Sequence, residues 1–303
     1  DYNQNKVESV IAGNEVKIGM INSSCKPDNL PYLVAKENNY FNEVIKVREV
    51  EMDRNIQFGD AKAYSDKYDI LATGRAQLYY MEATQPNIFK VFIANVNTLE
   101  KPDYAILVKN NSGIDTISQL KNKNIGVEKT SGKAKYVLMG IVLEKLGLNP
   151  TDFKITEAIT NDLKDGKVEA LYVREPQLSL ALSSGEYKVI VDAPIVKYVM
   201  SPWPQGFYAV SSDFAKNNAQ SASAVIRSLN KAVDFIKENP DKSKEILSKC
   251  IAENYAVNGV DGKLFEYWKA EEFDKETIQK QINLYHEKQL IPKTFSIGDF
   301  ILK

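Results

Sequence analysis

Short apolar runs alternate with stretches of helical spacing over most of the chain. After an opening strand at 16–21, the pattern predicts a helix at 31–41, a strand at 44–50, a weak helix at 55–66, and strands at 68–72 and 89–96. After Pro102 the alternation starts again, with predicted strands at 104–108, 124–128, 153–157, 169–173, 187–191 and 206–211. Strands and helices that alternate at this pitch are typical of βαβ units. We therefore predict an α/β fold with mostly parallel sheets.

The pattern becomes helical from residue 213 onward. One helical stripe is made by Val225, Ile226, Leu229, Ala232, Val233 and Ile236. The runs 246–251, 265–273 and 278–284 are predicted to continue the helical region. Two α/β units joined by extended crossings near 98–108 and 204–211, followed by helices, predict a bilobal architecture. Such a protein binds its ligand in the cleft between the lobes.

The segment 129–133 (KTSGK) is the first candidate for chemistry. It follows the predicted strand 124–128 and precedes a predicted helix at 131–146. A helix start leaves backbone N–H groups unpaired and carries partial positive charge, which suits a small anion. The alternative is that Ser131 only caps its own helix. Lys129 and Lys133 form the two ends of the segment, and their positive charges make an anion site as well supported as a simple helix cap.

Composition narrows the function classes. The 303 residues contain 44% hydrophobic and 26% charged residues, as in a soluble globular protein. A net charge of −1 gives no electrostatic footprint for nucleic acid, so we expect no nucleic-acid partner. Cys25 and Cys250 do not form a disulfide framework, and we expect two free thiols rather than a bridge. Because the chain starts at Asp1 without Met, we expect a mature or trimmed form, and we interpret the polar residues 1–14 as a frayed tail or a tether.

Several motifs resemble those of the nitrate/sulfonate/taurine-type solute-binding proteins of ABC importers. The resemblance begins with VKIGMINSSCKPDNLPYLVAKENNYF (16–41) and YDILATGRAQL (68–78). It continues through the segment that contains LKNKNIGVEKTSG, with Asn122-Lys123 where Gly-Lys is usual in the family. The segment LKDGKVEALYVREPQLSLALSSGEYKVI is also similar, with Glu169 in place of the usual Asp. The motifs occur in the family's order and cover about 16–300.

The resemblance implies a type II periplasmic-binding-protein fold. Lobe 1 would consist of 1–101 and 209–303, the second part mainly helical, and lobe 2 of 102–208. The ligand would be touched by the loops that leave the strands, which hold Asn22, Ser23, Ser24, Gly74, Arg75, Gln77, Thr130, Ser131, Gly132, Arg174, Glu175, Trp203 and Phe207. Ligands of open α/β sheets lie beyond the carboxyl ends of strands, so this expectation agrees with the helix starts at 73–77 and 130–133.

Three of these residues have a structural alternative. Arg75 is either an anion clamp at a helix start or a surface charge paired with Glu82 or Asp69. Arg174 is either a ligand contact or part of a helix-start pair with Glu175. Trp203 lies between two prolines and either points into the cleft or packs against the hinge.

Two classes of function fit this sequence. The first is a binder that captures a small solute outside the cytoplasm and delivers it to a membrane permease, as a monomer that needs no cofactor or metal. Residues 1–14 would then be a tether, with lipidation as one option. The second is an enzyme of the same fold, similar to pyrimidine synthases or a thiaminase. Those enzymes need a nucleophilic cysteine or a Cys- and His-rich patch, and this chain has two cysteines and one histidine. We therefore expect a binder and not an enzyme.

The ligand class follows from the candidate side chains. Two helix starts with Arg75, Lys129 and Lys133 favour an anion such as a sulfonate, taurine or nitrate. Trp203 and Phe207 also suit a flat heteroaromatic such as a thiamine-precursor pyrimidine, with Glu175 accepting from its amine. We favour the anion.

Overall fold

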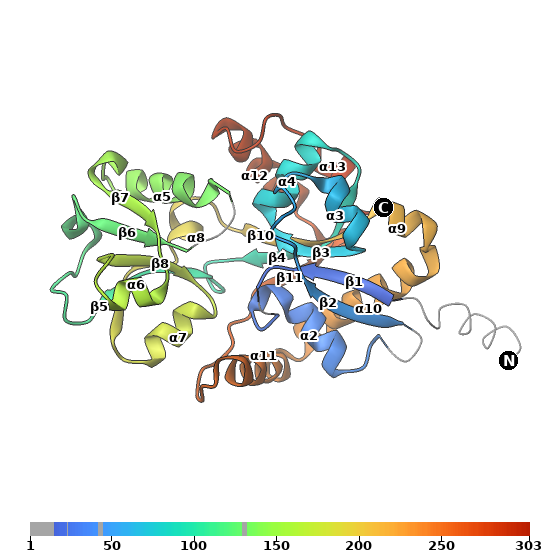
Figure 1. The fold of residues 1–303 in the computed structure, drawn as a ribbon, viewed down its shortest axis with the longest axis horizontal. Helices are drawn as coiled ribbons and strands as arrows, with labels where there is room; N and C mark the ends of the chain where they lie inside the picture. The colour runs from blue at the N-terminus through green and yellow to red at the C-terminus, as the bar shows by residue number, and fades with distance from the viewer. Residues whose placement is uncertain (1–14, 23, 42–44, 129–131) are drawn as a thin grey trace, which may run out of the picture.

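The strands form two separate sheets, each at the centre of one lobe (Figure 1). The structure is a computed structural model that describes residues 15–22, 24–41, 45–128 and 132–303. The six-stranded sheet of lobe 1 has the order β11-β4-β10-β3-β1-β2. Its strands are β1 (Glu15–Met20), β2 (Lys46–Glu51), β3 (Ile70–Gly74), β4 (Phe89–Asn97), β10 (Trp203–Ser211) and β11 (Glu266–Lys269).

The five-stranded sheet of lobe 2 has the order β7-β6-β8-β5-β9. Its strands are β5 (Tyr104–Lys109), β6 (Asn124–Val127), β7 (Lys154–Glu157), β8 (Ala170–Arg174) and β9 (Tyr187–Asp192). The chain enters this lobe through the link between β4 and β5. It returns through the link between β9 and β10, which contains α8 (Pro194–Tyr198).

Helices cover both faces of each sheet. Lobe 1 carries η1 (Pro27–Asn29), α2 (Leu30–Glu37), α3 (Ala61–Lys67), α4 (Arg75–Thr84), α9 (Ser212–Asn217), α10 (Ala219–Glu238), α11 (Pro240–Tyr255), η4 (Ala270–Glu272), α12 (Lys275–Glu287) and α13 (Ile297–Phe300). Lobe 2 carries η2 (Ile117–Leu120), α5 (Ala134–Lys145), η3 (Pro150–Asp152), α6 (Thr160–Lys164), α7 (Gln177–Ser183) and α8. The predicted stripe of α10 is confirmed for five of its six members, which are buried, whereas Ile226 is half-buried.

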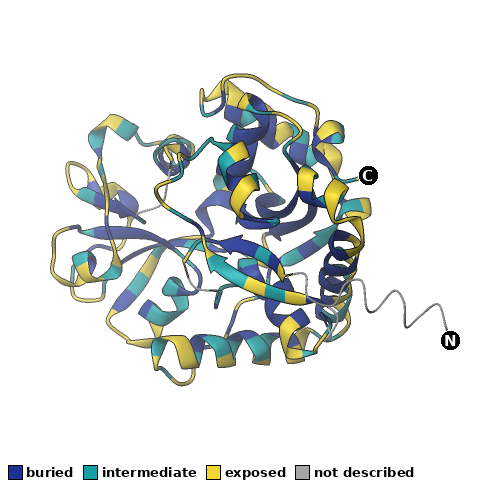
Figure 2. Cartoon of the chain, turned by 45° about the vertical axis from the view of Figure 1, so that its right-hand side comes forward, coloured by how far each residue is buried: buried dark blue, intermediate teal, exposed yellow. Residues whose placement is uncertain are grey.

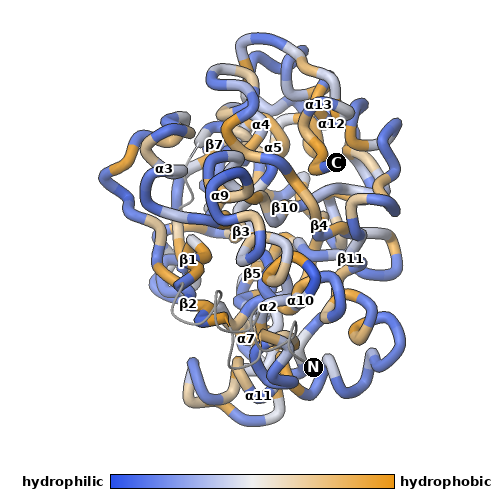
Figure 3. The backbone as a smooth tube through the Cα atoms, turned by 90° about the vertical axis from the view of Figure 1, so that its right-hand side faces the viewer, coloured by the Kyte–Doolittle hydropathy of each residue, from blue (hydrophilic) through white to orange (hydrophobic). Residues whose placement is uncertain are grey.

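Alternation along β10 explains how the sheet of lobe 1 is packed. Tyr208 belongs to the apolar cluster under α2 and α10, and its neighbour Phe207 to the cluster under α4, α12 and α13. Both side chains are fully buried. Successive strand residues point to opposite faces, so each aromatic ring anchors a different helical layer. Figure 2 shows the strands as largely buried between helices whose outer faces are exposed, and Figure 3 shows hydrophilic turns around an apolar middle.

The predicted α/β class is confirmed, whereas the mostly parallel sheets are not. Strand β1 pairs in parallel with β2 and β3, and β6 with β7 and β8. Strand β10 runs antiparallel to β3 and β4, β11 to β4, and β5 to β8 and β9. Strands β5 and β10, which follow the two links between the lobes, run opposite to their neighbours in the sheets. The chain has left one sheet and entered the other before each of these strands begins. Both sheets are therefore mixed.

Two other predictions about the elements were wrong. The run 265–273, predicted as helix, contains β11 and η4. A short apolar run does not separate strand from helix, and β11 forms here because the exposed edge of β4 accepts it as a partner. The second crossing, predicted at 204–211, lies earlier. The predicted lobe boundary after residue 208 thus falls inside β10, and we take the boundary to lie before Trp203.

The two cysteines are joined, which corrects the expectation of free thiols. Cys25 precedes η1 and Cys250 lies in α11, with a Cα–Cα distance of 5.3 Å and a sequence separation of 225. Packing of α11 against α2 brings the two residues together, and a separation of this length carries no signal in the spacing of cysteines. The disulfide fixes the segment before η1 to α11.

Candidate ligand-binding site at the junction of the lobes

Arg75 is the first residue of α4 and follows β3 directly, with Gly74 as the N-cap. Its side chain is buried, with 7% of the residue exposed. One guanidinium nitrogen, Nη1, donates to the carbonyl oxygen of Gln205 at 3.0 Å, and the guanidinium carbon lies 4.7 Å from the ring centroid of Trp203. The Nε group has no hydrogen-bond partner within the described residues.

Arg75 is not a surface charge paired with Asp69 or Glu82, which was the alternative to an anion clamp. Neither Asp69 nor Glu82 forms an ion pair with it in the described part of the chain. Asp69 accepts from the backbone N–H of Lys17, and Glu82 accepts from that of Asn87. A buried guanidinium without a carboxylate is costly, because the charge has lost water and gained no opposite charge. Such a group is suited to an anion that arrives from outside.

Aromatic and amide groups from both lobes surround this arginine. Tyr104 and Tyr172 of lobe 2 stack in parallel, with ring centroids 4.8 Å apart, and both lie within electrostatic reach of Arg75. Gln205 joins the two lobes, since its Nε2 donates to the Tyr104 hydroxyl at 2.8 Å. Trp203 Nε1 and the Tyr172 hydroxyl are buried and find no partner among the residues described. The Tyr285 hydroxyl and Gln205 Oε1 also have no partner in the described part of the chain, so several unused hydrogen-bonding groups lie in the neighbourhood of Arg75.

Arg174 binds two carboxylates and crosses between the lobes. Its Nη2 donates to both carboxylate oxygens of Asp28 in η1, at 3.0 and 2.7 Å, and its Nε donates to Asp103 Oδ2 at 3.0 Å. Asp28 belongs to lobe 1, whereas Asp103 lies in the link between β4 and β5. Burial alone would raise the pKa of Asp28, but the charges of Arg174 and Lys26 outweigh it and lower the pKa. Arg174 is thus engaged by the protein itself.

Three acidic groups near Arg174 have pKa values above the ordinary range of carboxyl groups. Burial raises the pKa of Asp103 to about 6, even though the charge of Arg174 opposes the shift. Burial likewise raises the pKa of Glu128 to about 7 and that of Glu175 to about 7. The Glu175 carboxylate accepts from the backbone N–H and hydroxyl of Ser179, so it caps α7 rather than facing an amine. Perturbed carboxyls concentrated at one place are typical of functional sites.

The first predicted binding loop is only partly described. Ser23 lies outside the described residues. Asn22 accepts from Arg54 Nη2 at 2.7 Å through its side-chain oxygen, and its backbone N–H donates to Glu51. Asn22 is exposed and adopts a positive φ of 60°. Ser24 is half-buried, and its carbonyl oxygen accepts from the N–H of Lys26.

The second predicted loop surrounds the start of α4. Gln77 accepts from the Thr73 hydroxyl at 2.9 Å and donates to the carbonyl oxygen of Phe58, so it holds the turn together. A Cβ added to Gly74 would meet nothing within 4 Å, which leaves open space at the helix start.

The segment 129–131 is not described, so the predictions for Thr130 and Ser131 lie outside the described residues. Helix α5 begins at Ala134 with Lys133 as its N-cap, three residues later than predicted. A Cβ at Gly132, whose φ is +91°, would lie 3.4 Å from the ring of Phe58 in lobe 1. This end of lobe 2 therefore approaches lobe 1 close to Gln77.

Trp203 and Phe207 have different surroundings. The Trp203 ring lies beneath the Arg75 guanidinium at the start of β10, which agrees with packing against the hinge. Phe207 packs against Tyr79, Phe273 and Phe300 in the core of lobe 1, with ring centroids 5.9, 6.1 and 6.4 Å away. We remove Phe207 from the candidate site because three core rings surround it.

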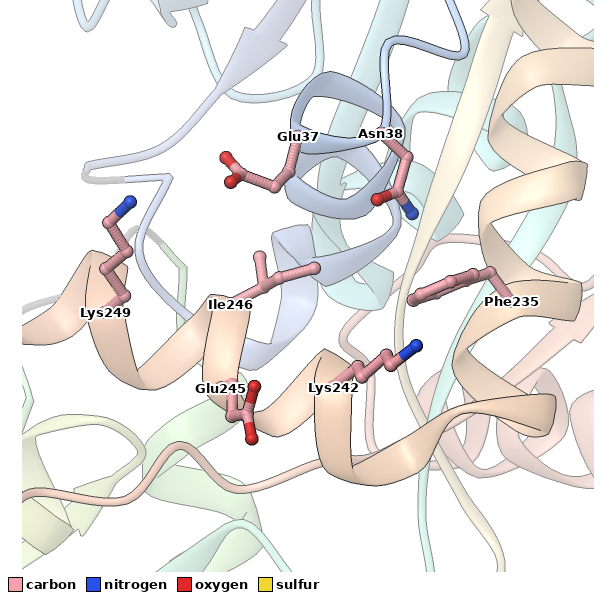
Figure 4. Close-up of a pocket in the computed structure, with 7 residues that line it drawn as sticks. All are labelled: Glu37, Asn38, Phe235, Lys242, Glu245, Ile246 and Lys249. Carbon is pink, nitrogen blue, oxygen red and sulfur yellow. The ribbon is translucent and has the colours of Figure 1, made fainter.

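A surface groove of about 350 Å³ lies between α2, α10 and α11, and none of the groups described above lines it (Figure 4). Lysines and glutamates alternate along its rim, and its lining consists of Glu37, Asn38, Phe235, Lys242, Glu245, Ile246 and Lys249. Exposed charges of both signs on flexible side chains give no fixed set of contacts for one ligand. The groove also lacks the strand ends where ligands of α/β folds bind.

Sequence reasoning missed Asp28, Asp103, Tyr104 and Tyr172. Asp28 had a weak signal, because it closes the loop that leaves the first strand. Asp103 lies between Pro102 and the first strand of lobe 2, and its pairing with Arg174 appears only when that strand folds beside β8. No group of three or more His, Cys, Asp or Glu residues suited to a metal ion was found within the described ranges.

Comparison with known proteins places the chain in a family. A family model described as NMT1/THI5 like matches residues 26–243, more than half of the chain. The chain belongs to the NMT1/THI5-like family. A Bacillus subtilis (strain 168) protein with the provisional name aliphatic sulfonates-binding protein is 26% identical to this NMT1/THI5-like protein over 259 residues, which cover 80% of this chain and 74% of that protein.

Solved structures show the fold of the NMT1/THI5-like protein. The periplasmic aliphatic sulphonate binding protein SsuA from Escherichia coli has a TM-score of 0.65 at 20% identity and covers 95% of this chain and 97% of its own. The alkanesulfonate-binding protein SsuA from Xanthomonas axonopodis pv. citri, bound to MOPS, has a TM-score of 0.64 at 17% identity and covers 95% and 98%. The predicted bilobal type II periplasmic-binding-protein fold and the predicted resemblance are confirmed.

Proposed function

We propose that this protein is the extracytoplasmic solute-binding component of an ABC importer and that it captures a small organic sulfonate between its lobes. The observation that carries the proposal is Arg75, a buried guanidinium at a helix start that has no carboxylate partner among the described residues. A guanidinium presents a planar fork of N–H groups to an oxyanion, and the start of α4 adds backbone N–H groups.

The related proteins support a sulfonate as the anion. The Bacillus subtilis relative carries the name of a sulfonate binder, and the Xanthomonas structure contains MOPS, which is a sulfonate. We assign the anionic group to Arg75 and to the space beside Gly74, with the free N–H of Trp203 as a further donor. The predicted contacts from Ser24 and Gly132 remain part of this proposal, whereas Ser23, Thr130 and Ser131 lie outside the described residues.

The disulfide supports a location outside the cytoplasm. Disulfides persist in oxidising compartments and are rare among cytosolic proteins. No helix in the described part of the chain has the length and apolar character that crossing a membrane requires. An importer of this kind hands its solute to a membrane permease, and residues 1–14, which the structure does not describe, would tether the protein to the membrane.

The main candidate for a catalytic nucleophile in the enzyme alternative is Cys25. A thiolate nucleophile at Cys25 would need a free thiol, and this sulfur is bonded to Cys250. The sequence contains only these two cysteines. Binding without chemistry is therefore the function that the site supports best.

Calorimetric titration with a matched set of small molecules tests the proposal. Ethanesulfonate and MOPS should bind, whereas propionate, with a planar head group of two oxygens, should bind more weakly. A thiamine-precursor pyrimidine serves as the competing class. Failure of every sulfonate to bind, or tight binding of the pyrimidine alone, would overturn the sulfonate assignment.

A further inference from the structure

The end of β8 and helix α7 of lobe 2 contact lobe 1 along a seam, which we define by Arg174, Gln177 and Leu180 on lobe 2 and by Asp28 and Tyr255 on lobe 1. Gln177 Nε2 donates to the Tyr255 hydroxyl at 3.0 Å, and Leu180 packs against the apolar cluster of lobe 1. The Asp28–Arg174 ion pair has its shortest N–O distance at 2.7 Å. Figures 1 and 3 both show α7 beside α11.

The lobe 1 half of the seam is held rigidly. Asn95 Nδ2 donates to the carbonyl oxygen of Asp28 at 3.0 Å, and the Tyr267 hydroxyl donates to that of Pro27 at 2.7 Å. The disulfide ties the segment before η1 to α11, which carries Tyr255 at its end. Asp28, the partner of Arg174, thus lies three residues after Cys25, and Tyr255, the partner of Gln177, lies on the helix to which Cys25 is covalently joined.

The lobe 2 half is held as well. Asp103 accepts from Arg174 Nε and, through its other oxygen, from the backbone N–H of Glu175. The guanidinium also lies over the ring of Tyr104, 5.7 Å from its centroid. Arg174 is therefore oriented before it meets Asp28. Side chains fixed in advance lose little entropy when they form a contact, so the contact favours closure more strongly.

We propose that the Asp28–Arg174 pair is a latch that holds the two lobes together, and that the Cys25–Cys250 disulfide sets the latch by fixing the position of Asp28. The pair joins residues of different lobes, so a movement that separates Asp28 from Arg174 would break it, and the pair favours the arrangement in which the lobes meet. Both side chains are largely buried, with exposed fractions of 14% for Asp28 and 17% for Arg174. Salt screens such a pair far less than an exposed one. The latch acts whatever solute the protein binds.

Small-angle X-ray scattering of the ligand-free protein tests the latch. Asp28→Asn keeps the shape of the side chain and removes its charge, and the open-to-closed ratio should rise at least about tenfold, because one partner of a largely buried ion pair is lost. The radius of gyration should then exceed that of the wild type. Asp115→Asn is the matched control, since Asp115 pairs with Lys188 within lobe 2 and is exposed. The same scattering curve for Asp28→Asn and wild type would overturn the proposal.

The disulfide is tested by reduction of the wild type and by the double variant Cys25→Ser/Cys250→Ser. Both should shift toward the larger radius of gyration while circular dichroism still shows a folded protein. Unchanged scattering after complete reduction would overturn the role of the disulfide. If Asp28→Asn does not fold, Tyr255→Phe removes only the hydroxyl that Gln177 contacts and should open the lobes in the same sense by less. No solute is added, so failure of the latch leaves the sulfonate assignment untouched.

Discussion

Replacement of Arg75 by Met separates the binding role of this residue from its structural role. Met keeps the length of the side chain and removes the charge. The variant loses a charged hydrogen bond to the Gln205 carbonyl, worth about 1.5–3 kcal/mol, and a stacking contact with Trp203, worth about 1–2 kcal/mol. It also no longer buries a guanidinium that has no carboxylate partner among the described residues, a burial that costs several kcal/mol. These contributions offset each other, so the free energy of unfolding should change by less than about 2 kcal/mol.

The effect on binding should be much larger than the effect on stability. Loss of the charge-assisted contact to a buried anion costs about 2–4 kcal/mol, or roughly 30- to 1,000-fold in Kd. Calorimetric titration with ethanesulfonate measures the affinity, and urea unfolding measures the stability. Arg227→Met is the matched control, because Arg227 is exposed on α10 and its side chain donates a hydrogen bond to Ser223 on the same helix. Wild-type affinity in Arg75→Met would refute the anion-clamp reasoning.

Two further predictions concern Glu82 and a pair of glycines. Burial raises the pKa of Glu82 from 4.5 to about 7, so the folded protein holds this proton more tightly, and the stability it contributes below pH 4.5 is lost as the pH rises to about 7. Urea unfolding at pH 5 and pH 8 measures this loss of free energy of unfolding, and Glu82→Gln should make the loss smaller by at most about 3 kcal/mol. The same loss in Glu82→Gln and wild type would contradict the raised pKa. Gly74→Ala should leave the melting temperature nearly unchanged but weaken sulfonate binding, because its Cβ enters open space at the helix start. Gly206→Ala, at the paired position in β10, should destabilise the protein by more than about 2 kcal/mol, because its Cβ would lie 2.7 Å from the Thr73 carbonyl oxygen; equal melting temperatures for the two variants would contradict this reasoning.

The parts of the fold that local patterns determine could be predicted from the sequence. Strand β4 and helix α10 appear where a short apolar run and helical spacing place them, because both patterns depend on neighbours within one element. Strand direction was not predictable, since it depends on where the chain returns from lobe 2. The run 265–273 also failed, because β11 forms only when the edge of β4 is present to accept it.

The residues of the candidate site were also predictable only where the signal is local in the sequence. Arg75 was found because a Gly-Arg pair at a strand end is a local signal. The partners of Arg174 were missed, because Asp28 is 146 residues away and Asp103 is 71 residues away, and no spacing connects them. Burial of Phe207 was missed because alternation along a strand does not tell which of its two faces meets the ligand.

The position of β10 has a consequence for the order in which the protein can be made. This strand lies between β4 and β3 in the sheet of lobe 1, yet it follows the whole of lobe 2 in the chain. As the chain emerges from the ribosome, β3 and β4 have no shared neighbour until residue 203 and those after it have been synthesised. The strands of lobe 2 are continuous in sequence, from β5 to β9, so this lobe can complete its sheet first. The lobe that begins the chain is therefore the last to be finished, and a chain that stops before β10 leaves it with a gap at its centre.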